Sequence, residues 1–406
     1  MIRLLILSVF VLSNLVALID FYINEKLKGD IYGYVVGEKE LLLVTFLLLI
    51  ASFILPLIFY RVNFNLLKKV SFKKIFNNEK HQGKLISYFI LVVVLIWLYD
   101  IILSGKIAGN IDVGNSGPAR LVSILFKPEY LVIIYYAVYR ELRLAKLIIV
   151  LYFFGIMFQG WMSYLAYIFI IEIYYQFGKN INFKQGFLVF IIFVAGILLL
   201  PILRMAKLYY VGNLNMVGFS EFLFFGFEGG FSNNYIYFFD RVIQRLQHLS
   251  NYYYLLDNID YYKMSLMNGE FCKYYCEGSA IEVFRGFFLG YDDFNFHRYF
   301  ASSIDPRANI EYAWNITVGL FVWPFLLNSS IELFFFLFYI SFLVFLIAFL
   351  TRLINSRAVT DLSWLVLVLL LCHGWFGDVV IYIQCLFVFI ILGLVTKCRV
   401  KYNFKN

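Results

Sequence analysis

Charged residues are scarce in this chain. Asp, Glu, Lys and Arg together make up 15% of its 406 residues, whereas soluble domains contain about 25%. The sequence also has no low-complexity linker and no repeat with a period of about 20 to 50 residues, the range typical of solenoids and propellers. These absences exclude an ordinary soluble domain and a repeat array.

Motifs for cofactor and nucleophile chemistry are missing as well. The sequence has no G-x-S-x-G elbow, no phosphate-binding Walker loop and no haem signature in a usable context. Two acidic pairs, Asp292 with Asp293 and Glu38 with Glu40, lack the further ligands that a metal site needs. We therefore expect no cofactor and no essential metal.

Apolar residues are what the chain has in abundance. Hydrophobic residues account for 62% of the sequence and aromatic residues for 21%. About ten apolar runs are long enough to cross ~30 Å of hydrocarbon, which takes a helix of ~20 residues. The fold class that follows is an all-α polytopic membrane protein with about ten transmembrane helices.

The basic residues indicate the orientation of these spans. The formal net charge is +8, but Lys and Arg gather in short connectors, above all Arg61 to Lys84, Arg352 to Arg357 and the C-terminal tail. This distribution follows the positive-inside rule and argues against a nucleic-acid partner. Met1 to Ile23 has no small-residue cleavage site, so we expect a retained first span. Both termini are therefore expected in the cytoplasm.

Ten spans are predicted from the apolar runs. Their approximate bounds are Leu4 to Ile23, Leu41 to Tyr60, Leu85 to Leu103, Leu121 to Tyr139, two spans within Leu147 to Phe177 that meet at a tight turn near Gln159-Gly160, Phe187 to Leu203, Ile331 to Leu350, Leu362 to Phe376 and Val379 to Leu394. Three regions result: transmembrane helices 1 to 7 in residues 1–204, a large periplasmic loop in residues 205–329, and transmembrane helices 8 to 10 with a cytoplasmic tail in residues 330–406.

The long loop is expected to be exported and mainly helical. Between Met205 and Glu311 it has eight Lys and Arg against twelve Asp and Glu, a net charge of −4 in a chain that is otherwise basic. Only an odd number of spans can join an outer loop to the cytoplasmic connector at Arg352. We therefore expect Trp314 to Leu327 to be a re-entrant or interfacial helix.

One stretch of the loop has a cationic face. In "FDRVIQRLQHLSNYYYLL" the residues Arg241, Arg245 and His248 are spaced i, i+4 and i+7, which places them on one side of an amphipathic helix. Arginine binds phosphate oxygens with two parallel hydrogen bonds, so this stripe is suited to the pyrophosphate of a lipid carrier. A solvated face, or contact with anionic lipid headgroups, explains the same spacing. Arg204, directly after the seventh span, is a further pyrophosphate-binding candidate or an interfacial anchor.

A second polar group follows in "FRGFFLGYDDFNFHRYFASSIDPRANIEYAWN". This stretch has the mixture of cations and acids from which a cationic clamp and a general base can be built, although some of its members must be surface charges. The base candidates are His297, Asp305 and Glu311, and the further pyrophosphate-binding candidates are Arg285, Arg298 and Arg307.

Two other features concern single residues. Cys272 and Cys276 are the two cysteines of the exported loop, which favours a disulfide, although their spacing demands a turn. Glu172 lies within an apolar run and is a candidate for a proton route.

This layout resembles the Wzy-type O-antigen polymerases, bacterial inner-membrane enzymes related to O-antigen ligases and grouped with GT-C glycosyltransferases. The resemblance is one of organisation over most of the chain. It rests on the loop opened by Arg204, on Arg241 and Arg245 within it, on "YAWNITVGLFVWPFLL" after it, and on the hairpin around Gln159-Gly160-Trp161. Family members often have an arginine near that hairpin, and this chain does not. Asn315 stands where ligases often have a histidine, which favours a polymerase.

The resemblance implies transfer of a growing glycan from one undecaprenyl-pyrophosphate-linked oligosaccharide to a hydroxyl of another, in lipopolysaccharide or related polysaccharide biosynthesis. The expected partners are these lipid-linked oligosaccharides, membrane lipid and a chain-length regulator protein. The alternatives are an O-antigen ligase or another GT-C transferase that uses a lipid-phosphate sugar, and a flippase. A flippase is expected to have short outer loops and polar groups at mid-membrane, and the loop of about a hundred residues counts against it.

Overall fold

The computed structural model describes residues 2–70, 75–76, 80–104, 118–159, 163–177, 247–278, 295–308, 310 and 315–403, with a few isolated positions between 187 and 236. In this part of the chain the fold is helical, and Lys26 and Val35 form an isolated antiparallel β bridge. The structure divides into two compact units: Met1–Leu47 with Ile173–Asp257, and Leu48–Glu172 with Asn258–Asn406.

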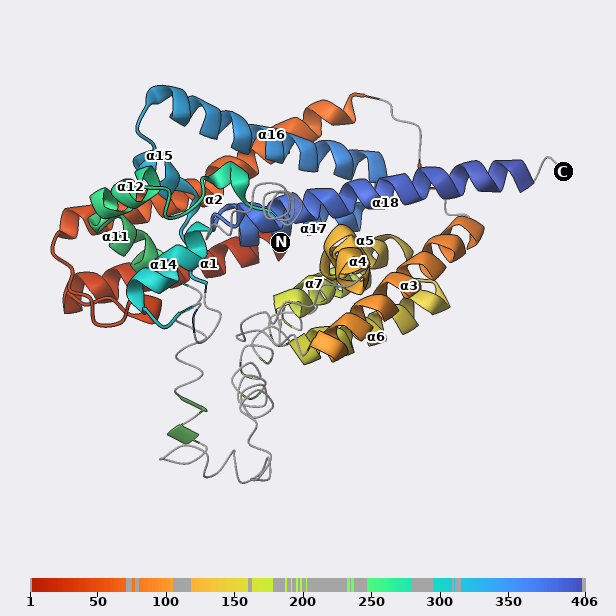
Figure 1. The fold of residues 1–406 in the computed structure, drawn as a ribbon, viewed down its shortest axis with the longest axis horizontal. Coiled ribbons are helices and arrows are strands. Elements are labelled where there is room, and N and C mark those ends of the chain that lie inside the picture. Colours follow the sequence, from red (N-terminus) through yellow and green to blue (C-terminus); the bar gives the residue numbers. More distant parts are fainter. Residues whose placement is uncertain are drawn as a thin grey trace. The chain divides into compact units, whose positions relative to one another are not determined.

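The helices follow one another along the chain as labelled in Figure 1. They are α1 (Ile2–Asn24), the 3-10 turn η1 (Gly29–Ile31), α2 (Lys39–Lys68), α3 (Lys80–Ser104), α4 (Pro118–Phe126), α5 (Pro128–Tyr139), α6 (Arg143–Gln159), α7 (Ser163–Phe177), α11 (Leu249–Asp257), α12 (Ile259–Met267), η2 (Tyr274–Cys276), α14 (Phe296–Ile304), η3 (Leu320–Val322), α15 (Trp323–Leu326), α16 (Ser330–Ile354), α17 (Arg357–Val366), the π-helical η4 (Leu367–Leu371) and α18 (Phe376–Asn403).

The membrane class is confirmed. Among the described residues, five helices are long and apolar enough to cross a bilayer: α1, α2, α3, α16 and α18. Their surfaces agree with a lipid environment, because large apolar side chains such as Leu47 and Ile102 are well exposed. The predicted seventh span lies almost entirely outside the described residues.

The predicted fourth span is two helices. α4 ends at Phe126 and α5 begins at Pro128, and the residue between them, Lys127, has a left-handed backbone with φ 40°. Pro128 lacks an N–H and disfavours a helical residue before it, which explains the break. The break leaves carbonyl groups at the end of α4 without helical hydrogen bonds, and side chains of α18 supply donors for them. Gln384 Nε2 donates to Leu125 O at 2.6 Å, and Cys385 Sγ lies 3.6 Å from Phe126 O. A backbone break is tolerated in a membrane protein where such partners exist.

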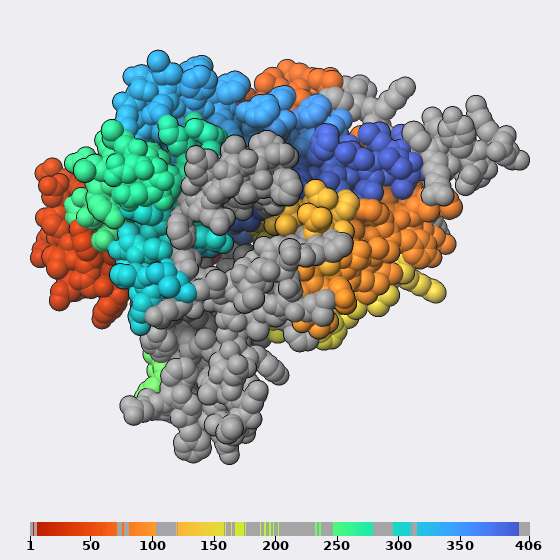
Figure 2. All heavy atoms as spheres, viewed as in Figure 1, coloured from red at the N-terminus to blue at the C-terminus, as the bar shows by residue number. Residues whose placement is uncertain are grey.

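The larger unit is a bundle built around α18 and α3. α18 packs against α16, α5 and α3, and α3 packs against α4 and α6. Figure 2 shows α18 in blue directly against α3 in orange. Close contact is built into the sequence at Gly155 on α6, where a Cβ atom would lie 2.3 Å from the ring of Trp97 on α3. The bundle is therefore held by shape as well as by apolar burial.

The smaller unit is organised by Asn14, near the middle of α1. Its Oδ1 accepts hydrogen bonds from the backbone N–H groups of His248 and Leu249, at 2.8 and 3.1 Å, and its Nδ2 donates to Phe10 O at 2.7 Å. Asn14 lies ten residues before the end of α1, which is about 15 Å along the helix. A polar side chain in an apolar span thus supplies the cap of another helix, α11.

The connector between α1 and α2 holds the other end of α11. The Tyr34 hydroxyl donates to Asp257 Oδ2 at 2.7 Å, and the Tyr253 hydroxyl accepts from the backbone N–H of Glu38 at 3.1 Å. At the start of the helix, Gln247 Oε1 accepts from the N–H of Ser250 at 3.1 Å. These contacts fix both ends of α11 against the residues that follow α1.

The segment after the loop differs from the expected re-entrant helix. From residue 315 to 319 it has no regular secondary structure, and the helical part is η3 followed by the four-residue α15. Ile316, Val318, Leu320 and Val322 are all buried, so this segment belongs to the core. Gly319 has φ 81°, which interrupts any helix at this point.

We expect the chain to cross the membrane three times after this segment, through α16, through α17 with η4, and through α18. Reporter fusions should therefore be cytoplasmic after Lys84 and at Asn406, and periplasmic near Asn258. A periplasmic C-terminus would contradict this parity.

Replacing Asn14 by Leu should destabilise the protein by about 1–2 kcal/mol, the usual value of a lost helix cap, because two backbone N–H groups lose their acceptor. Thermal unfolding in detergent measures this loss. Ser13→Ala is the matched control, since the Ser13 hydroxyl bonds a carbonyl of its own helix, Phe10 O. Equal melting temperatures for the two variants would show that the Asn14 cap contributes nothing.

Candidate functional site

The first turn of α16 has a capping box. Ser329 Oγ accepts from the backbone N–H of Glu332 at 3.1 Å, and Glu332 Oε2 accepts from the N–H of Asn328 at 3.1 Å. The sequence S-x-x-E before an apolar run is a helix-start signal. This box sets where the apolar helix begins and which way Glu332 points.

Glu332 also binds a residue of the loop. Lys273 Nζ lies 2.6 Å from Glu332 Oε1. The hydrogen bond to Glu332 raises the pKa of Lys273, so the ammonium group stays charged at neutral pH. A loop cation and a helix acid therefore meet at the end of α16 that faces the loop.

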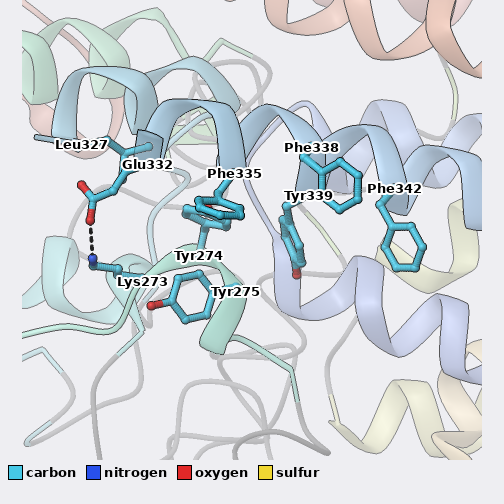
Figure 3. Close-up of a pocket in the computed structure, with 9 residues that line it drawn as sticks. All are labelled: Lys273, Tyr274, Tyr275, Leu327, Glu332, Phe335, Phe338, Tyr339 and Phe342. Carbon is cyan, nitrogen blue, oxygen red and sulfur yellow. Dashed lines mark hydrogen bonds and ion pairs between the residues drawn. The ribbon is translucent and has the colours of Figure 1, made fainter. Parts of the chain in front are cut away.

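A groove runs from this ion pair along α16. It has a volume of about 420 Å³ and is lined by Lys273, Tyr274, Tyr275, Leu327, Glu332, Phe335, Phe338, Tyr339 and Phe342. Figure 3 shows the ion pair at one end and the rings of Phe338 and Phe342 at the other. Between Glu332 and Phe342 the helix rises about 15 Å. The groove is therefore amphipathic along its length, polar at its loop end and aromatic further along the helix.

The loop side of the groove rests on a buried aromatic cluster. Phe271 stacks on Phe296 with ring centroids 4.4 Å apart, and Tyr274 meets Trp323 edge-on at 5.5 Å. Tyr299 on α14 donates a hydrogen bond to Glu270, and burial together with this bond raises the pKa of the Tyr299 phenol. Tyr274 and Tyr275 of η2 thus line this wall of the groove, and side chains of α14 and α15 belong to the aromatic cluster behind it.

His297 lies inside this wall and not at its surface. It is 1% exposed, with Nδ1 2.8 Å from Ile316 O and Nε2 2.9 Å from Gly374 O. Its ring stacks on Trp375 with centroids 3.9 Å apart. Burial lowers the pKa of His297 to about 4, and this outweighs the two carbonyl contacts, which act in the opposite direction. The geometry is that of a structural tie between segments and gives no support to His297 as a base that reaches a substrate.

The tie depends on two glycines that touch. Gly319 N–H donates to His373 O at 3.1 Å, and Leu320 N–H donates to Cys372 O at 3.4 Å. Gly374 has φ 79°, and a Cβ atom there would lie 3.0 Å from the carbonyl carbon of Gly319. The sequence elements "TVG" and "CHG" are therefore backbone contacts between the post-loop segment and the turn before α18.

The other predicted site residues in the described part of the chain do not point to one common site. Asp305 caps the C-terminus of α14 and forms a two-fold contact with Arg307, with Arg307 Nε 3.2 Å from Asp305 Oδ1 and Nη2 3.1 Å from Oδ2. Arg298 is exposed, and its backbone N–H is capped by Asn295. His297 and Asp305 lie at opposite ends of α14, about 12 Å apart along its axis. Asn315 is exposed and directly precedes the residue that binds His297.

The conformation of His248 differs from that expected for the predicted cationic stripe. Gln247 and His248 are not helical, and α11 begins at Leu249, so His248 does not continue a helix face from Arg245. Its backbone is held by Asn14, and its ring stacks on Phe10 at 6.3 Å. The remaining predicted site residues lie outside the described residues: Arg204, Arg241, Arg245, Arg285 and Glu311.

The predicted disulfide between Cys272 and Cys276 is not formed, and both side chains are thiols. Cys276 ends the 3-10 turn η2, with its N–H bound to Lys273 O, while Cys272 is buried before that turn. The turn that the spacing demands is present, but it does not pair the two sulfur atoms.

Glu172 has a partner that the sequence did not show. Tyr136 donates to Glu172 Oε1 at 2.5 Å, and Arg140 Nη1 lies 3.4 Å from Oε2. Tyr136 lies in the last turn of α5, and Arg140 directly follows that helix. The pairing explains how the acid is accommodated near an apolar run without a proton route.

Comparisons with protein-family models, with curated proteins and with solved structures found no match to this chain.

Sequence reasoning missed most of the groove. The apolar run from Ile331 to Leu350 predicts a span that includes Phe338, Tyr339 and Phe342, and neither Lys273 nor Glu332 is among the predicted site residues. The capping box at Ser329 was a readable signal for the exact start of α16. No local pattern indicates that Lys273, 59 residues earlier, meets that start.

His297 should make stability depend on pH. Its pKa is about 4 in the fold and about 6.5 in an unfolded chain, so its contribution is complete above pH 6.5 and is lost as the pH falls toward 4. The loss amounts to about 3 kcal/mol from the two pKa values. Thermal melts of the wild type and of His297→Gln between pH 4 and 8 test this. An identical pH dependence in the two proteins would rule out His297 as the cause.

Proposed function

We propose that this protein is a glycosyltransferase that polymerises undecaprenyl-pyrophosphate-linked oligosaccharides into O-antigen or a related surface polysaccharide, at the outer face of a bacterial inner membrane. The observation that supports this most is the groove along α16. It combines an aromatic stretch on a candidate membrane span with a polar end formed by the loop. A substrate made of a long apolar chain, a charged linkage and a sugar has the same order of parts.

The aromatic stretch suits the isoprenoid chain. Phe335, Phe338 and Phe342 are all well exposed on the surface of α16, so a lipid tail can lie along them without entering a closed cavity. Each CH₂ that leaves water in such a contact contributes about 0.8 kcal/mol relative to water. Within a bilayer the gain is smaller, because lipid already surrounds the tail, and the groove then acts mainly by shape.

The polar end suits the linkage and the sugars. Lys273 is charged and pairs with Glu332, which the capping box holds in place. When a phosphate approaches, Lys273 can leave the Glu332 carboxylate and bind the phosphate as its new anionic partner. Tyr275 is half exposed beside them and offers a ring for stacking on a sugar. The forked side chains of Arg241 and Arg245 suit a pyrophosphate by their chemistry, and their part in the transfer stays a prediction from the sequence.

A ligase and a flippase remain separable from a polymerase by one experiment. Lipopolysaccharide from a strain that lacks this gene should carry single repeat units in place of long chains. Complementation with the wild-type gene should restore the long chains. A complete absence of repeat units would indicate a ligase or a flippase, and unchanged chain lengths would contradict the proposal.

The groove itself is tested by two matched substitutions on α16. Phe338 stacks on Phe342 in the groove, and Phe345 stacks on Phe349 outside the groove lining. Phe338→Ser should weaken the binding of lipid-linked substrate about tenfold, which corresponds to ~1.4 kcal/mol. Phe345→Ser should leave binding unchanged. Saturation curves of polymerisation against lipid-linked substrate give both values, and equal effects of the two substitutions would exclude the groove as the binding site.

A further inference from the structure

The turn after α12 places a carboxylate at the surface of the loop. Asn268 ends the helix, and Gly269 follows with φ 74°. Gly269 N–H donates to Leu266 O at 3.2 Å, and Glu270 N–H donates to Ser265 O at 3.0 Å. These two bonds form a Schellman motif, which needs a left-handed residue after the helix, a conformation that glycine adopts without strain. The backbone of Glu270 is therefore fixed directly beyond α12, and Glu270 is exposed.

Hydroxyl groups from two helices gather at this carboxylate. Tyr299 of α14 donates a hydrogen bond to Glu270, and the Tyr299 oxygen lies 2.8 Å from Ser265 Oγ and 3.1 Å from the Tyr261 hydroxyl. Ser265 is buried at 3% exposure, which anchors the group on α12. A hydroxyl both donates and accepts, so a network of this kind can extend to the hydroxyl of a bound molecule.

The carboxylate of Glu270 is a strong acceptor. Hydrogen bonds, above all the one from Tyr299, lower the pKa of Glu270, so it is ionised at neutral pH. Its Oε1 contact with Asn268 Nδ2 is long, at 3.4 Å, whereas N–H···O bonds usually measure about 2.9–3.0 Å. A better donor can therefore replace Asn268. Hydrogen bonds to an ionised acceptor are about twice as strong as those between neutral groups.

An exposed aromatic ring belongs to the same network. Tyr261 is 52% exposed, and its ring meets that of Tyr262 edge-on with centroids 5.0 Å apart. Tyr262 is fully buried, and its hydroxyl lies 2.8 Å from Ser303 Oγ on α14. The buried ring supports the exposed one. A supported tyrosine ring can stack on the apolar face of a sugar at a low cost in conformational entropy.

This surface lies close to the polar end of the groove. Glu270 precedes Lys273 by three residues, which span at most about 11 Å of extended chain. Between them, the ring of Phe271 packs on Phe296 and on Tyr299, with centroids 4.4 and 4.9 Å apart. One aromatic cluster therefore supports both the groove wall and the hydroxyl network. A sugar chain that begins at a phosphate beside Lys273 can reach Glu270 and Tyr261.

We propose that Tyr261, Glu270 and Tyr299 form a binding site for the oligosaccharide of the substrate whose lipid lies along the groove. This inference rests on the proposed function, which supplies the lipid-linked sugar. The Tyr261 ring stacks on a sugar ring, and Glu270 accepts hydrogen bonds from sugar hydroxyls. A negative charge on the sugar is repelled by Glu270. The site therefore favours neutral sugars over acidic ones at this position.

A purely structural role is the alternative, in which Glu270 serves only to hold α12 against α14 through Tyr299. Two probes separate the roles: lipid pyrophosphate that carries a whole repeat unit of neutral sugars, and lipid pyrophosphate that carries only the first sugar. Each is titrated into the purified full-length protein in detergent, so that dissociation constants are measured without turnover. The ratio of the two constants isolates the contribution of the distal sugars.

Substitutions in the site should reduce this ratio. A charge-assisted hydrogen bond and an aromatic contact each contribute about tenfold, so the wild type should bind the whole repeat unit about 100-fold more tightly than the single sugar. Tyr261→Ala and Glu270→Gln should each lower the ratio about tenfold without changing the binding of the single-sugar probe. Tyr32→Ala, which removes an 80% exposed tyrosine of the connector between α1 and α2, should leave the ratio unchanged.

Tyr261→Ala should also melt at the wild-type temperature, because the ring it removes is exposed. A wild-type ratio in Tyr261→Ala and in Glu270→Gln would overturn the proposal. Equal weakening of both probes would overturn it too, because a structural role predicts that result. A wild type that binds the whole repeat unit more tightly than the single sugar but joins no repeats would support the binding site and refute the proposed function.

Discussion

The described structure depends on one constraint: backbone N–H and C=O groups next to an apolar environment must find partners within the protein. Residues 315 to 319 after the loop are not helical, and their backbone bonds instead to the turn before α18 and to His297. The touching glycines Gly319 and Gly374 bring these backbones close enough to bond. Backbone bonds therefore position the post-loop segment, which leads into α15, against the turn before α18.

The same constraint explains the polar residues within apolar runs. Asn14 caps α11, and Gln384 binds the carbonyl left over where α4 ends. In the sequence both are polar residues within an apolar run. Their partners are 235 and 259 residues away, so only the fold shows that each completes the hydrogen bonds of another segment.

The class of the protein could be predicted from its sequence, but most of the site could not. Long apolar runs predicted the spans at α1, α2, α3, α16 and α18, because hydrophobicity over about twenty residues is a local property. The break at Lys127 was signalled by Pro128 and missed. His297 was one of three candidates for a general base, yet its chemistry here is decided by burial and by two carbonyl groups from distant segments. The groove arises where a loop lysine meets a helix start, and no local pattern predicts that meeting.

The groove gives the proposed transfer a physical order. In this proposal an aromatic stretch orients the lipid, and a charged loop end receives the linkage. The most direct measurement uses purified protein in liposomes with a lipid-pyrophosphate-linked oligosaccharide as the sole substrate. The account predicts chains of two or more repeats, with one lipid pyrophosphate released for each new glycosidic bond. Release of lipid pyrophosphate without chain growth, or no reaction at all, would contradict it.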